Sequence, residues 1–140
     1  MIKSDIEKFK PAIKELAEKY QLSLVVLFGS QVTGKTHSES DFDIAYYANR
    51  KVDFNDKIMI NTMLTGILEN INVQLVDIKT ASPLLLKKIV NQAVVLYEVC
   101  PNLFDELYIY AQRVYAEAEP LFELREHYVT NKIKNYSHVW

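Results

Sequence analysis

Glycine, cysteine and long apolar runs are scarce in this chain of 140 residues. With Cys100 as the one cysteine, the chain cannot form an internal disulfide or a cysteine-based metal cluster, which suits a reducing compartment. No apolar run approaches the length needed to cross a bilayer. The charged residues 1–10 also lack the apolar stretch of a signal peptide. We therefore expect a cytoplasmic protein that makes no membrane contact.

An excess of basic charge is also absent. Sixteen basic and 18 acidic residues give a formal net charge of −2. This balance excludes a broadly basic surface that coats a nucleic-acid backbone, so we expect no direct nucleic-acid partner. Hydrophobic residues at 49% and charged residues at 24% are typical of a folded domain rather than a disordered chain.

The spacing of apolar residues predicts alternating helices and strands. Period-3.6 patterns predict helices, and short β-branched runs predict strands. The helices are expected at 4–20, 53–70 and 83–92, and the strands at 22–28, 42–47, 71–78 and 93–99. From residue 101 the chain has helical periodicity throughout, and Pro120 leaves two interpretations open: two helices, or one kinked helix.

Two of the three glycines lie close together in one polar segment, at Gly29 and Gly34. Gly29 and Ser30 directly follow the apolar run 22–28. A glycine at the end of a strand allows a phosphate to approach the backbone, and a serine hydroxyl with the following amides can donate hydrogen bonds to it. Lys35, in the same loop, is a further candidate for contact with a phosphate.

Two aspartates border the next predicted strand. Asp41 and Asp43 are two residues apart and therefore point to the same face, while Phe42 and Ile44 point toward a core. Paired carboxylates repel each other unless a cation lies between them, and hard oxygen ligands suit Mg²⁺. A lone Gly-Ser or Asp-x-Asp is usually a surface turn, but here both adjoin apolar strands. Together they predict a two-metal site for a nucleoside triphosphate.

The pattern Gly-Ser, ten residues, Asp-Phe-Asp resembles the signature of the DNA polymerase β-like nucleotidyltransferase superfamily. The stretches VVLFGS, SDFDIA, VQLVDIKTASPLLLKKIV and AVVLYE extend the resemblance over most of the chain. With the helical tail, the chain is similar to the MntA-type minimal nucleotidyltransferase antitoxins, which partner HEPN-domain RNase toxins. The resemblance implies an α/β (α+β) fold: a mixed sheet of about four strands, with helices largely on one face. We expect a nucleotidyltransferase domain at 1–100 and, in the same structural unit, a helical extension at 101–140.

The resemblance implies that the protein catalyses adenylyl transfer. Members of this family move AMP from ATP to a tyrosine hydroxyl of the toxin and release pyrophosphate. Carried over to this chain, Gly29 and Ser30 hold the triphosphate with Lys35 nearby, and Asp41 and Asp43 are the catalytic carboxylates that bind two Mg²⁺ ions. The extension at 101–140 is expected to be a partly exposed interface toward a HEPN toxin or a second copy.

Gln74 departs from the family pattern, in which this strand usually carries a third acidic residue. A glutamine amide is neither a base nor a good metal ligand, so slower chemistry is expected. Asp77 lies three residues further on, faces the other way, and is expected to cap the strand end. Two alternatives stay open: an antitoxin that neutralises its partner by binding alone, and a nucleotidyltransferase acting on small molecules.

Overall fold

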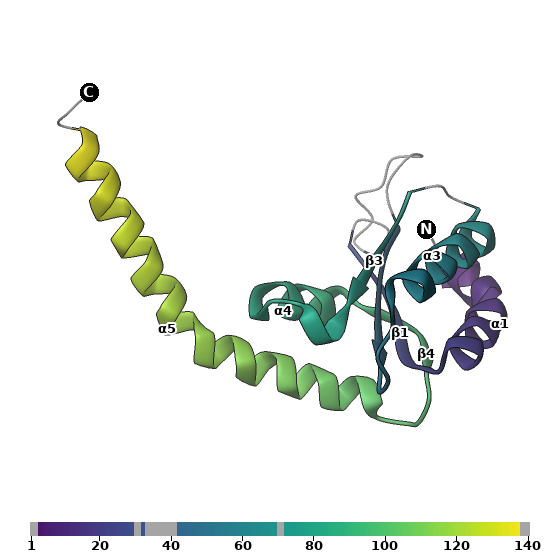
Figure 1. Cartoon of the computed structure of the whole chain (residues 1–140). Coiled ribbons are helices and arrows are strands. Elements are labelled where there is room, and N and C mark those ends of the chain that lie inside the picture. Colours follow the sequence, from purple (N-terminus) through teal and green to yellow (C-terminus); the bar gives the residue numbers. More distant parts are fainter. Residues whose placement is uncertain (1–2, 30–31, 33–41, 70–71, 138–140) are drawn as a thin grey trace.

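The computed structural model describes residues 3–29, 32, 42–69 and 72–137. Figure 1 shows a sheet with helices on both sides and one long helix that leaves the body of the molecule. In chain order the elements are α1 (Lys3–Tyr20), β1 (Leu22–Phe28), β2 (Phe42–Ala48), α3 (Phe54–Leu68), β3 (Val73–Asp77), the 3₁₀ helix η1 (Ile78–Thr80), α4 (Pro83–Gln92), β4 (Val94–Glu98) and α5 (Leu103–Ser137). Each helix and strand expected from the spacing of apolar residues is present, with ends shifted by a few residues.

The four strands form one mixed sheet, as predicted, and its strand order is β3-β2-β1-β4. The central strand β1 pairs antiparallel with both β2 and β4, whereas β2 pairs parallel with β3. Because parallel neighbours need a crossover connection, α3 has to pass over one face of the sheet between β2 and β3. The end of β1, the start of β2 and the start of β3 therefore lie at the same edge of the sheet.

Local capping explains where the middle helices begin. The Asp53 side chain accepts a 2.7 Å hydrogen bond from the Asp56 amide at the start of α3. Ser82 does the same for the Leu85 amide at 3.2 Å, with Pro83 at the first position of α4. Both caps satisfy amides that have no partner inside the helix, and both starts are visible in the sequence.

Helices cover both faces of the sheet, so the expectation that they pack largely on one face is wrong. Alternate residues of the strands enter two separate cores, one beneath α1 and α3 and the other beneath α4 and α5. All seven residues of β1 are buried. A strand in which both sets of alternating side chains are apolar requires a cover on each side, and the run Leu22–Phe28 has this composition.

The tail is one helix, which settles the choice that Pro120 left open. Helix α5 is continuous through Pro120 and changes direction beyond its first half (Figure 1). Its first half packs on α4, and residues 119–134 are exposed throughout. None of the helices in the described residues combines the length and the apolar composition that a membrane span requires.

Candidate active site

Gly29 and Asp43 lie directly against each other at the edge where β1 ends and β2 begins. In the antiparallel pairing, Phe28 is the partner of Asp43, so Gly29 follows at once. Gly29 is buried and has a φ of 85°, a conformation that residues with a side chain rarely adopt. A Cβ added there would collide with the Oδ2 atom of Asp43. The fold thus brings together one residue from each half of the predicted motif.

Gln74 is the next neighbour of Asp43 on the other side. The parallel pairing of β2 with β3 places Asp43 opposite Gln74, and paired residues point to the same face. Asp43 is half-buried, and Gln74 is exposed. Three groups therefore lie in a row across this edge of the sheet: the Gly29 backbone, the Asp43 carboxylate and the Gln74 amide.

Asp77 lies on the opposite face, where its carboxylate accepts a 2.9 Å hydrogen bond from the Lys79 amide and caps η1. The interpretation of Asp77 as a capping residue is therefore confirmed. Asp77 is also the cross-strand partner of Tyr46. Burial, with a smaller contribution from the Asp77 carboxylate, raises the pKa of Tyr46 to about 12, and Arg50 opposes this shift.

Three of the predicted site residues, Ser30, Lys35 and Asp41, lie outside the described residues. Within the part of the chain that is described, no three His, Cys, Asp or Glu side chains cluster as metal ligands would. Mg²⁺ is usually bound by one or two carboxylates together with substrate phosphates rather than by a complete protein cage. The Asp43 carboxylate, set against a backbone turn without a side chain, fits such an ion.

Gln92 is a residue of this region that sequence reasoning missed. Its side-chain Oε1 accepts a hydrogen bond of 3.1 Å from the Gly29 amide. The two residues are far apart in sequence, and no local pattern links them. They meet because β4, which follows α4, pairs with β1: Leu27 is opposite Val94, so Gly29 is brought to the end of α4.

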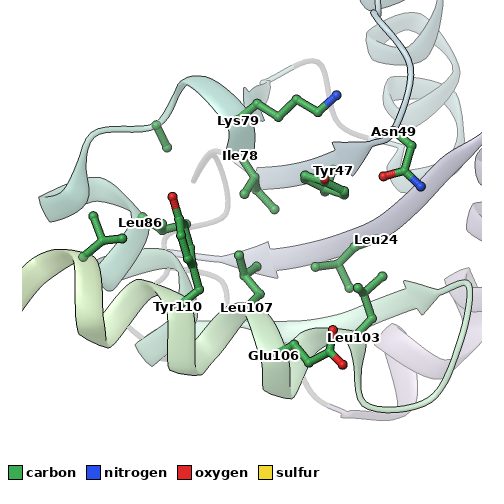
Figure 2. A pocket seen from close by; sticks show the side chains of 12 residues that line it. Leu24, Tyr47, Asn49, Ile78, Lys79, Leu86, Leu103, Glu106, Leu107 and Tyr110 are labelled. Carbon is green, nitrogen blue, oxygen red and sulfur yellow. The ribbon is translucent and has the colours of Figure 1, made fainter.

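A cleft opens at the other end of the same sheet face, between the sheet and α5. Figure 2 shows this cleft of about 520 Å³, lined mainly by apolar side chains. Leu24 and Tyr47 form part of its floor, and Leu103, Leu107 and Tyr110 close it from α5. Because Tyr47 lies four residues along β2 from Asp43, the cleft lies about 13 Å from the Gly29–Asp43 contact.

The chain matches known proteins over most of its length. Residues 11–101 match the family described as Polymerase beta, Nucleotidyltransferase. The protein adenylyltransferase MntA of Shewanella oneidensis is 36% identical over 72 residues, which span about half of each protein, 51% in both cases.

Several solved structures are similar in fold, among them two toxin–antitoxin structures. A toxin–antitoxin structure with AMP-PNP has a TM-score of 0.66 and 27% identity, over 81% of this chain and 95% of that one. The complex of the tri-AMPylated Shewanella oneidensis HEPN toxin with the MNT antitoxin has a TM-score of 0.65 and 25% identity, over 91% of this chain and 98% of that one. The family match contains both Gly29 and Asp43 and extends from α1 to the end of β4. The chain therefore belongs to the polymerase beta nucleotidyltransferase family.

Proposed function

We propose that this protein is a Mg²⁺-dependent protein adenylyltransferase. It transfers AMP from ATP to a tyrosine hydroxyl of a HEPN-domain RNase toxin and so acts as an antitoxin. The observation that carries the proposal is the contact between Gly29 and Asp43, in which a carboxylate suited to Mg²⁺ lies against a backbone turn that has no side chain. The likeness to a toxin–antitoxin structure with AMP-PNP supports ATP as the substrate.

The proposed roles follow from this geometry and from the family signature. Gly29 forms the turn that leaves room for the triphosphate, Ser30 and Lys35 contact the triphosphate, and Asp41 and Asp43 bind two Mg²⁺ ions. These ions would neutralise phosphate charge and lower the pKa of the attacking hydroxyl. The tyrosine oxygen forms a bond to the α-phosphorus, the bond from that phosphorus to the bridging oxygen breaks, and pyrophosphate leaves.

The exposed half of α5 is the proposed partner surface. It carries large apolar side chains that no other part of the described chain covers: Leu121, Phe122, Leu124, Tyr128, Val129 and Ile133. Exposed apolar side chains gathered on one element mark interaction surfaces. The likeness to a complex between a HEPN toxin and an MNT antitoxin supports a toxin as the partner. We assign residues 101–140 to this interface and residues 1–100 to the nucleotidyltransferase domain, as parts of one structural unit.

The direct test is transfer of label to a HEPN-domain toxin, for which the product of the neighbouring gene is the candidate. We expect label from ATP marked at the α-phosphate to appear on the toxin and label at the γ-phosphate to be released. Asp43→Asn should abolish transfer, whereas Glu15→Gln on the exposed face of α1, outside the proposed site and interface, should not. Absence of α-label on the toxin in the presence of Mg²⁺ would contradict the proposal.

Gln74 tests how far the missing carboxylate limits the reaction. Gln74→Asp places a carboxylate beside Asp43, where it can bind metal and accept the hydroxyl proton, so we expect the transfer rate to rise by about 10²-fold. Gln74→Asn keeps the amide and is the matched control, expected to transfer no faster than the wild type. Equal rates for the two variants would show that the position plays no part in the chemistry.

A binding-only antitoxin is the second candidate, and the same Gln74 position favours it, because the side chain beside Asp43 cannot act as a base. The two candidates differ in what Asp43→Asn does in cells. An adenylyltransferase loses the ability to neutralise the toxin, while an antitoxin that works by binding alone keeps it. The neutralisation assay therefore separates them.

A further inference from the structure

The end of helix α4 contacts the glycine turn through one side chain. The Gln92 Oε1 atom accepts a 3.1 Å hydrogen bond from the Gly29 amide, and the contact is partly buried. Gln92 is the last residue of α4, and β4 begins two residues later at Val94. Since Val94 is paired with Leu27, the sheet register itself places the end of α4 beside the glycine.

This bond, with a second one, occupies both backbone polar groups of Gly29. The Gly29 carbonyl accepts a hydrogen bond of 3.1 Å from the Val32 amide, while its own N–H donates to Gln92. The Gly29 amide is therefore not available to a phosphate. Its part in the site is conformational: at a φ of 85° and with no Cβ, it turns the chain while leaving room for the Asp43 carboxylate.

Helix α4 is a rigid support for this contact. Three of its side chains, Leu86, Ile89 and Val90, are buried in the core beneath α5. Toward α5, Asn91 accepts a 3.0 Å hydrogen bond from Gln112, and the Lys87 ammonium lies 3.8 Å from the centre of the Tyr115 ring. A side chain carried by a packed helix holds its target more closely than one carried by a loop.

We propose that Gln92 is a positioning residue for the triphosphate turn. By holding the Gly29 amide, it fixes the direction in which the chain leaves β1 and so the orientation of the turn relative to Asp43. Gln92 itself touches neither substrate nor metal. This role rests on the proposed function, because it presupposes that the turn after β1 binds the triphosphate.

The hydrogen bond between Gln92 and Gly29 is tested first without nucleotide, by using NMR to measure the rate of hydrogen exchange at the Gly29 amide. The chain has three glycines, so few glycine signals need assignment. Gln92→Met keeps the length of the side chain but removes the acceptor, and it should speed exchange of the Gly29 amide about three- to tenfold. Gln92→Glu retains an acceptor and should restore the wild-type rate. Exchange at the wild-type rate in Gln92→Met would overturn the proposal.

The positioning role is tested by kinetics on the full chain with its toxin. Gln92→Met should raise the KM for Mg-ATP about three- to tenfold and leave the KM for the toxin unchanged. Asn91→Ala is the matched control, because it removes the neighbouring bond to Gln112 and does not reach Gly29. An unchanged KM for Mg-ATP in Gln92→Met would overturn the positioning role while leaving adenylyl transfer intact. No turnover of ATP by the wild type would instead refute the proposed function and, with it, this role.

Discussion

At the scale of the residue, the site depends on one place where a side chain is not allowed. Gly29 has a positive φ, and the space that its Cβ would fill is taken by the Asp43 carboxylate. Either constraint alone favours glycine. Together they mean that the turn and the carboxylate are built against each other, so that neither can shift without the other.

Gly29→Ala is therefore expected to disturb the site more than the fold. The left-handed conformation costs a residue with a Cβ about 1–2 kcal/mol, and Asp43 must also move aside. We expect lower stability and at least a tenfold loss of Mg-ATP affinity, measured by urea denaturation and calorimetry. Gly66→Ala is the control: no atom lies within 4 Å of its Cβ, and alanine inside α3 should stabilise the protein by about 0.5–1 kcal/mol. Unchanged nucleotide affinity in Gly29→Ala would contradict the account.

The raised pKa of Tyr46 predicts that the protein becomes less stable at alkaline pH. Its pKa is raised from 10.0 to about 12, mainly by burial, so the folded protein keeps the phenolic proton after the unfolded chain has lost it. The free energy of unfolding contributed by Tyr46 is intact below pH 10 and falls as the pH rises from about 10 to about 12, by up to about 2–3 kcal/mol. The measurement is urea denaturation at pH 8 and pH 11. Tyr46→Phe should lose less stability between these values than the wild type, and an equal loss would refute the shift.

At the scale of the element, α5 has two halves with different roles. The first half closes the apolar cleft over β1 and β2, through Leu103 and Leu107 among others (Figure 2). The second half is exposed. A helix that stabilises the body at one end and presents apolar side chains at the other is suited to hold a partner.

Charge placed on the two halves should therefore have different effects. The double variant Leu121→Glu with Leu124→Glu changes two side chains that are 66% and 67% exposed, so we expect an unchanged melting temperature and loss of toxin binding in a pull-down. Leu107→Glu places a charge in the half-buried lining of the cleft and should lower the melting temperature by several degrees. Undiminished capture of the toxin by the double variant would show that the partner binds elsewhere.

The elements were predictable where their signals are local. The caps at Asp53 and Ser82 and the apolar run of β1 indicate their helices and strand directly. That helices cover both faces of the sheet was not predicted, because this depends on the side on which each connecting helix crosses the sheet. The fully apolar strand β1 was nevertheless a signal, since a strand buried at every position needs a cover on each side. The sequence did not decide whether Pro120 ends or bends α5. The outcome depends on how the preceding turns of α5 pack on α4, and the spacing of apolar residues does not reveal that packing.

At the scale of the whole molecule, the candidate site is a product of strand order. The sequence indicates Gly29 and Asp43 by their composition and spacing, and the pairing of β1 with β2 brings them into contact. Gln92 carries no signal in the sequence, because it reaches Gly29 only through the pairing of β4 with β1. Prediction from sequence therefore named Gly29 and Asp43, which the fold brings into contact, and missed Gln92, which accepts a hydrogen bond from Gly29.

The central claim is that Gly29 and Asp43 form one site for a magnesium-bound triphosphate. Calorimetric titration of the protein with an ATP analogue in which a methylene group replaces the oxygen between the α- and β-phosphates tests it most directly. This analogue cannot give up AMP, and it can be titrated with and without Mg²⁺. We predict binding that requires Mg²⁺, is lost in Asp43→Asn and is retained in Asp105→Asn. Binding of equal strength in wild type and Asp43→Asn, or no uptake of the nucleotide in the presence of Mg²⁺, would contradict the claim.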